Sequence, residues 1–203
     1  MEGPSIGIIG GGSWATAIAK IMTENLSSVN WWVRDKKIIN HIQKHGNNPN
    51  YMSTIQLDSS KLYLTSNIND VVKLSDYLVL AIPSAFLHSA LKNIKSPMHN
   101  KLVFSAIKGI VPEKNTIVGE YIHNHFSVPY NNIGIITGPC HAEEVDLEKL
   151  SYLTVACTDL KKARFFADLI SCKYINSTVS DDIYGTEYAA VLKNIIAIAS
   201  GIC

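Results

Sequence analysis

The sequence lacks an excess of charge of either sign. Its 203 residues include 18 Lys and Arg against 17 Asp and Glu, which gives a formal net charge of +1. Nucleic-acid-binding proteins usually carry a basic excess, so we expect no nucleic-acid partner. Disordered chains combine high charge with low hydrophobicity, whereas here 17% of residues are charged and 47% are hydrophobic. The composition therefore predicts a globular protein with a large core.

Long apolar runs are also missing. A membrane-spanning helix needs about 20 consecutive apolar residues. The longest candidate, residues 195–202, is less than half that length and contains Ser200 and Gly201. The first apolar run, residues 6–9, is too short for the apolar region of a secretory signal and ends in glycines. We therefore expect a cytoplasmic protein with no membrane span.

Cysteine is scarce and shows no paired spacing. The four cysteines are Cys140, Cys157, Cys172 and Cys203, and none belongs to a C-x-x-C motif. The spacing therefore suggests neither a disulfide framework nor a metal site.

What the sequence does contain is an alternation of short Ile- and Val-rich runs with longer amphipathic segments. We predict strands at residues 6–9, 29–33, 62–65, 77–82, 102–107, 133–137, 152–157 and 173–176. Helices are predicted at 13–25, 35–45, 69–74, 84–94, 115–125 and 160–170, and a last one starts near Asp181 or Tyr184. This order is typical of an α/β fold with a Rossmann-like, doubly wound, mainly parallel sheet.

The end of the sequence is unusual for a domain. It stops at Cys203 inside an apolar, helix-like stretch, residues 189–202, without a cap or a polar tail. We expect residues 1–180 to form a dinucleotide-binding domain and residues 181–203 to be the first helix of an α-helical substrate domain. On this interpretation the remainder of a longer protein is absent.

A glycine-rich turn follows the first predicted strand. Residues 10–15, Gly-Gly-Gly-Ser-Trp-Ala, fit the pattern G-x-G-x-x-G/A between a buried strand and a helix. In this pattern Gly10 allows the tight turn, Gly12 lets the backbone approach a pyrophosphate, and Ala15 permits close contact between helix and strand. The N–H groups at the helix start favour phosphate binding. An ordinary flexible turn is the alternative interpretation.

The end of the second predicted strand leaves the choice of dinucleotide open. Arg34 and Asp35 stand where a dinucleotide site normally has an acidic residue for the ribose hydroxyls. Arg34 can stack on adenine or pair with a 2′-phosphate. Asp35 can face the ribose or cap the next helix. Both NAD and NADP therefore remain candidate cofactors.

Two lysines are the strongest candidates for chemistry. Lys108 directly follows an apolar strand and precedes a glycine, at the edge of the sheet where ligands bind. Lys193 lies in an otherwise apolar helix, which predicts a desolvated side chain. A desolvated lysine near a second cation has a lowered pKa, suited to acid–base work. We expect Lys108 to be that cation. A surface position for Lys108 and a solvent-reaching Lys193 are the plainer alternatives.

Cys140 and His141 suggest a further alternative. Cys140 precedes a helix start, a position that lowers a thiol pKa, and His141 is a neighbouring base. Neighbours in sequence seldom point at one another, however, and no third supporting residue is evident.

With these residues in place, the chain resembles the NAD(P)-dependent glycerol-3-phosphate dehydrogenases of the bacterial type. The matching motifs are Gly10-Gly-Gly-Ser-Trp-Ala-Thr-Ala17, Asn50-Tyr51, Leu80-Ala-Ile-Pro-Ser84, Ser105-Ala-Ile-Lys-Gly109, Thr137-Gly-Pro-Cys-His-Ala-Glu-Glu144 and the stretch from Glu187 through Leu-Lys-Asn-Ile-Ile-Ala-Ile-Ala-Ser-Gly201. They follow the family order along nearly the whole chain.

The resemblance implies roles for individual residues. It implies that Ser13, Trp14, Arg34 and Ala142 contact the cofactor, NAD or NADP. Lys108 would touch cofactor and substrate, Gly138 and Cys140 would line the substrate site, and Lys193 would be the proton acceptor. The implied reaction interconverts sn-glycerol 3-phosphate and dihydroxyacetone phosphate and feeds glycerophospholipid synthesis. The partner is then a small phosphorylated substrate, and a homodimer is a candidate assembly.

The sequence also departs from the family. Ala15 stands where members usually carry Gly, and Cys140 stands where many have Ser or Thr. The family's C-terminal domain supplies an Asp that assists the lysine and an Arg-Asn pair that binds substrate phosphate, and we expect both to be missing here. A dinucleotide-binding module without turnover is therefore the second hypothesis. A ketopantoate reductase-like or sugar-nucleotide dehydrogenase-like enzyme is the third.

Overall fold

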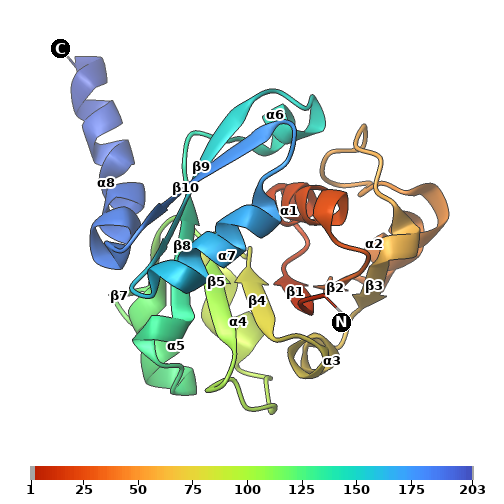
Figure 1. Ribbon diagram of the computed structural model, residues 1–203, viewed down its shortest axis with the longest axis horizontal. Helices are drawn as coiled ribbons and strands as arrows, with labels where there is room; N and C mark the ends of the chain where they lie inside the picture. Colours follow the sequence, from red (N-terminus) through yellow and green to blue (C-terminus); the bar gives the residue numbers. More distant parts are fainter. Residues whose placement is uncertain (1–2, 203) are drawn as a thin grey trace.

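An eight-stranded sheet forms the centre of the molecule. The computed structural model describes residues 3–202, apart from the side chain of Asn194. The strands of the sheet are β1 (Ile6–Ile9), β2 (Val29–Trp32), β3 (Leu62–Thr65), β4 (Tyr77–Leu80), β5 (Leu102–Ser105), β8 (Ile133–Thr137), β9 (Ser151–Cys157) and β10 (Ile175–Ser180). Their order is β10-β9-β8-β5-β4-β1-β2-β3 (Figure 1). The β8–β9 pair is antiparallel and the other pairs are parallel. The predicted Rossmann-like, mainly parallel sheet is confirmed.

Helices cover both faces of this sheet. They are α1 (Ser13–Asn25), α2 (Lys36–His45), α3 (Ile68–Leu74), α4 (Ser84–Leu91), α5 (Val118–Phe126), α6 (Ala142–Asp146), α7 (Leu160–Ile170) and α8 (Ile183–Ile202). Two short 3-10 turns span Ser59–Lys61 and Tyr130–Asn132. Buried residues of α1, α2, α6 and α7 form one core cluster with the sheet, and those of α3, α4 and α5 form the other.

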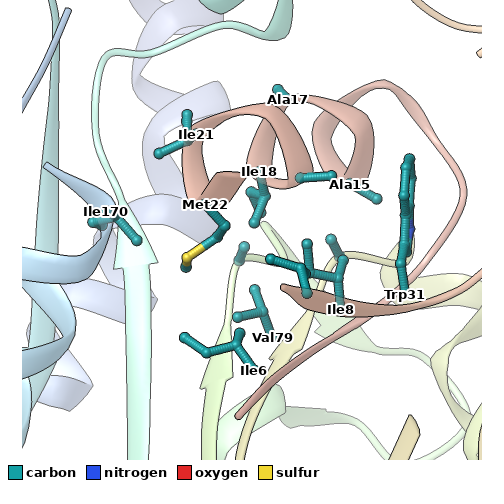
Figure 2. Close-up of a cluster of buried hydrophobic side chains, with 14 of the residues drawn as sticks. Ile6, Ile8, Ala15, Ala17, Ile18, Ile21, Met22, Trp31, Val79 and Ile170 are labelled. Carbon is teal, nitrogen blue, oxygen red and sulfur yellow. The ribbon is translucent and has the colours of Figure 1, made fainter. Parts of the chain in front are cut away.

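The central strands alternate between these two clusters. In β1, Ile6 and Ile8 belong to the cluster under α1, whereas Ile9 belongs to the opposite one. Figure 2 shows Ile6 and Ile8 below the side chains of Ile18 and Met22 of α1. Because both faces are covered, these strands are continuous apolar runs rather than alternating ones.

The structure corrects several of the predicted elements. The strands predicted at 77–82 and 102–107 end at Leu80 and Ser105, the helix predicted at 84–94 ends at Leu91, and α6 has no predicted range. The helix predicted at 115–125 begins only at Val118, because Thr116–Ile117 (β7) pairs with Ile110–Val111 (β6) in a short antiparallel hairpin. The strand predicted at 173–176 is β10, which begins at Ile175 and ends at Ser180. β10 is an edge strand that pairs with β9 alone, so its sequence does not need an apolar run.

The last helix, α8, extends away from the body of the molecule (Figure 1). Its first turns are anchored, since Ile183 and Glu187 are buried. Beyond Leu192 its large apolar side chains are exposed, and Ile196 is 66% exposed. Cys203 lies outside the described residues. Among the helices of residues 3–202, none has both the length and the apolar character needed to cross a bilayer.

Candidate functional site

The order of the strands creates a crevice at one edge of the sheet. The chain runs outward from β1 to β2 and β3 on one side and to β4 and β5 on the other. At such a reversal the loops at the carboxyl ends of the strands part and leave room for a ligand. Two cavities of about 610 and 410 Å³ lie there, and Gly12, Ala81, Ile82 and Pro83 line both.

The glycine-rich turn lies between the two cavities. Gly10 has a φ of +146°, and a Cβ there would lie 2.1 Å from the carbonyl oxygen of Ala81. Only glycine fits this backbone without a shift. A Cβ on Gly12 would meet nothing within 4 Å, so the backbone is open to an approaching group. Gly12 is also the N-cap of α1 and provides no side-chain cap, which leaves the first N–H groups of the helix for a ligand.

The larger cavity contains the end of β2. Arg34 and Asp35 line it, together with Tyr51 and several amide side chains, among them Asn67. Asp35 caps α2 by accepting the backbone N–H of Lys37 at 2.8 Å. Of the two roles considered for Asp35, the cap is the one that the structure shows. The polar lining thus combines a cationic side chain, a carboxylate and neutral amides.

The smaller cavity brings together most of the other predicted residues. Ser13 and Trp14 come from the start of α1, Lys108 follows β5, and Cys140 and Ala142 follow β8. The indole N–H of Trp14 is buried and has no hydrogen-bond partner among the described residues. A buried donor of this kind favours a ligand that brings an acceptor. The residues present therefore fit a dinucleotide across both cavities.

Lys108 is partly desolvated and lies beside a second cation. Although the residue is exposed overall, partial desolvation and then the charge of Lys193 lower the pKa of its ammonium group. Lys193 itself is exposed on α8, so its predicted desolvation is wrong. The apolar neighbours of Lys193 on α8 are themselves exposed, Leu192 by 45% and Ile195 by 64%, so the helix does not bury this lysine. The two lysines are still close enough to interact, as predicted.

The loop after β8 is shaped by a glycine and a buried thiol. Gly138 has a φ of +143°, and a Cβ there would lie 2.4 Å from the carbonyl oxygen of Tyr152. Cys140 is 3% exposed, and burial raises the pKa of its thiol. The lowered pKa considered for this residue is therefore wrong. The backbone N–H of His141 donates to Glu144 at 2.9 Å, so His141 serves as the N-cap of α6.

Comparison with known proteins now connects this geometry to a family. A sequence model described as "NAD-dependent glycerol-3-phosphate dehydrogenase N-terminus" matches residues 5–163. The chain belongs to this family. It is 34% identical over 199 residues to a glycerol-3-phosphate dehydrogenase [NAD(P)+] of Staphylococcus carnosus and 33% identical over 204 residues to one of Limosilactobacillus reuteri. The matches cover 97% of this chain and 60% and 59% of those relatives. The chain thus spans about 60% of the length of the curated relatives that it matches.

Solved structures of the same family share the fold. The glycerol-3-phosphate dehydrogenase of Plasmodium falciparum superposes with a TM-score of 0.88 at 24% identity, covering 100% of this chain and 59% of that one. The enzyme of Coxiella burnetii superposes with a TM-score of 0.84 at 22% identity, covering 98% and 60%. At this identity the likeness concerns the fold alone.

Two buried polar residues near this site are not predicted by the sequence patterns. Asn48 is fully buried beside the glycine-rich turn, and Glu187 of α8 is buried against the start of α5. Asn48 is one of several polar residues in a loop, and no periodic pattern marks it. Glu187 is marked in the sequence only as the first residue of a family motif. A buried polar side chain must find partners, but the sequence does not show which polar residues are buried.

Proposed function

We propose that the protein is an NAD(P)-dependent oxidoreductase that interconverts sn-glycerol 3-phosphate and dihydroxyacetone phosphate, using NAD or NADP. The observation that carries this proposal is the pair of adjoining cavities at the strand reversal, with Gly12 between them and Lys108 in the smaller one. Membership of the glycerol-3-phosphate dehydrogenase family supports the choice of substrate. Its product would feed glycerophospholipid synthesis.

On this proposal the two cavities hold the two halves of the cofactor. Gly10 and Gly12 shape the pyrophosphate turn, and Arg34 binds the adenosine half. Ser13, Trp14, Lys108 and Ala142 line the nicotinamide half. When bound, the nicotinamide supplies hydride transfer, and the protein positions it.

The remaining residues act on the substrate. During reduction, negative charge develops on the carbonyl oxygen, and a cation or proton donor must face it. We assign Lys193 as the acid and base and Lys108 as the neighbouring cation that stabilises this charge. Gly138 and Cys140 line the substrate side, and Cys140 reaches the smaller cavity.

The proposal also includes the organisation of the chain. Residues 1–180 would be the dinucleotide-binding domain, and residues 181–203 the first helix of a helical substrate domain. We propose a cytoplasmic enzyme that acts on a small phosphorylated substrate. A homodimer is proposed because the exposed apolar side chains of α8 suit burial against another surface.

A dinucleotide-binding module without turnover is the second candidate. It is favoured by the exposed position of Lys193, which does not line either of the two cavities formed by the described residues. Protein fluorescence titrated with NADPH and NADH, followed by an assay of NADPH oxidation with dihydroxyacetone phosphate, separates the two. Turnover supports the enzyme, and binding without turnover supports the module. Failure to bind either dinucleotide overturns both, and oxidation with ketopantoate instead would identify a related reductase.

A further inference from the structure

The glycine-rich turn, residues 10–12, is held from inside the fold through its carbonyl oxygens. The indole N–H of Trp31 donates to the first of these carbonyls at 2.7 Å. The side-chain amide of Asn48 donates to the second at 3.2 Å. The hydroxyl of Thr16 donates to the third at 2.9 Å. Three successive carbonyls thus each accept a hydrogen bond from a side chain.

Asn48 is the central member of this group. It is fully buried, as are Thr16 and Trp31, although it lies in the loop between α2 and β3. Its Nδ2 also donates to the hydroxyl of Thr16 at 2.9 Å, and its Oδ1 accepts the backbone N–H of Asn50 at 3.2 Å. The Asn48 amide therefore binds the glycine-rich turn directly and also through the hydroxyl of Thr16. Its oxygen stabilises the loop that contains Asn48.

The direction of the carbonyls decides the direction of the N–H groups. In a trans peptide unit the C=O and the following N–H point in opposite directions. When the carbonyls of residues 10–12 face the interior donors, the N–H groups of residues 11–13 are directed away from them. Outward N–H groups at a helix start are what a bound phosphate requires. A turn that lost its interior donors would sample orientations in which a carbonyl oxygen faces the anion.

We propose that Asn48 is a positioning residue for dinucleotide binding, acting through the carbonyls of the glycine-rich turn. Thr16 extends its reach by one hydrogen bond. The inference rests on the proposed function, since the ligand that the turn would hold is the pyrophosphate of NAD or NADP. On this proposal Asn48 does not contact the pyrophosphate itself and acts only through the backbone of the glycine-rich turn.

Three variants test the hydrogen bonds of Asn48 and Thr16 separately. Asn48→Asp keeps the oxygen that accepts from Asn50 but removes both donated bonds. Thr16→Val removes the hydroxyl in a side chain of the same shape, and Thr16→Ser keeps it. Because Asn48→Asp introduces a buried carboxyl group that can prevent folding, Thr16→Val is the variant that decides in that case.

A matched control lies on the same helix. Thr23 is also buried, and its hydroxyl donates to the carbonyls of Ala19 and Lys20, away from the glycine-rich turn. Thr23→Val therefore makes the same chemical change in the same helix. A purely structural role predicts that Thr16→Val and Thr23→Val behave alike.

The first measurement is the Kd for NADPH, from quenching of protein fluorescence in the 203-residue chain, together with the thermal midpoint. We expect Thr16→Val to weaken binding about fivefold and Asn48→Asp about tenfold or more, in line with the loss of one and two hydrogen bonds. Thr16→Ser and Thr23→Val should stay within about twofold of the unchanged protein, whatever their thermal midpoints. If Thr16→Val binds NADPH as well as Thr23→Val does, the proposal is wrong.

The second measurement needs no ligand. Amide hydrogen exchange at Gly10, whose N–H donates to the carbonyl of Trp32 at 3.3 Å, should be faster in Thr16→Val than in Thr23→Val, because the turn has lost an interior tether. Equal exchange in the two variants would overturn the proposal. If the unchanged protein does not bind NADPH, the proposed function fails on the first measurement, and the exchange data still decide whether the turn is tethered.

Discussion

The carboxylate of Glu187 accepts the backbone N–H of Val118 at 2.8 Å, so a residue of α8 caps the start of α5. A second bond, from the N–H of Gly119 at 3.2 Å, completes the cap. Glu187 is 2% exposed, and desolvation raises its pKa from 4.5 to about 7, although both backbone donors oppose the shift. This contact joins the last helix to the sheet-forming part of the chain.

The first prediction concerns the pH dependence of stability. In the unfolded chain Glu187 releases its proton near pH 4.5, whereas in the folded chain it keeps it until about pH 7. Its contribution to the free energy of unfolding therefore falls as pH rises through this window, by about 3 kcal/mol. Glu187→Gln keeps an acceptor oxygen but does not titrate. Urea unfolding at pH 4.5 and pH 8 should show the variant gaining on the unchanged protein at pH 8. A stability difference that is the same at both pH values would contradict the raised pKa.

The second prediction contrasts two glycines of one turn. Gly10→Ala forces a side chain into a left-handed backbone and against the carbonyl of Ala81, and should cost more than about 2 kcal/mol of unfolding free energy. Gly12→Ala meets open space and should cost about 1 kcal/mol or less. The methyl group of Gly12→Ala should instead weaken NADPH binding. Chemical denaturation and dinucleotide titration of both variants check this, and equal stability losses would refute it.

The third prediction concerns the choice of dinucleotide. Arg34 lines the larger cavity, whereas the carboxylate of Asp35 accepts a hydrogen bond from the backbone N–H of Lys37. Arg34→Ala should weaken NADPH binding about tenfold or more and NADH binding much less, since a charged hydrogen bond to a 2′-phosphate is lost. Lys36→Ala removes a neighbouring exposed cation and serves as the control. An equal loss for both dinucleotides would remove Arg34 from the 2′-phosphate.

The fourth prediction tests the coupling of the two lysines. The charge of Lys193 contributes to the lowered pKa of Lys108. Lys193→Met should therefore raise the pKa of Lys108 toward its ordinary value, without restoring it fully, because desolvation is the larger cause. Lysines carrying ¹³C-methyl groups can be titrated by NMR, with Lys36 as an exposed reference. A Lys108 titration that does not respond to the substitution would show that the lysines act independently.

The fifth prediction concerns thiol reactivity. Burial disfavours the thiolate of Cys140, whereas Cys172 is only partly buried. Iodoacetamide at neutral pH should therefore modify Cys172 well before Cys140, and in urea the two rates should converge. Mass spectrometry of digested protein gives both rates. Fast labelling of Cys140 in the folded protein would revive its interpretation as a nucleophile.

Much of the fold could be predicted because local signals agree with the global arrangement. Ser13–Asn25 and Leu160–Ile170 have the predicted bounds, since each combines helical spacing with a clear start. β10 was misplaced because an edge strand needs no apolar run, and the hairpin at residues 110–117 is too short to give a periodic signal. β10 has only Ile175 in the buried class and each hairpin strand is two residues long, so neither segment produces a repeating pattern in the sequence.

The candidate site also contains residues that could be predicted from the sequence and residues that could not. Residues that follow strands, such as Lys108 and Arg34, could be found because the carboxyl edge of a parallel sheet collects them. The exposure of Lys193 could not be predicted, because apolar neighbours in the sequence do not show which side chains of a helix are exposed. Asn48 stayed hidden since its role depends on three-dimensional contacts with residues far away in sequence.

Because β9 runs antiparallel to β8, one wall of the smaller cavity is formed by a connection that can vary in length. This connection, the segment 138–150, both leaves and re-enters the sheet at the crevice edge. Lengthening such a segment costs little closure entropy and moves no strand. Changes of length in this segment, outside the buried core residues of α6, would therefore remodel a wall of the smaller cavity without altering the order of the strands.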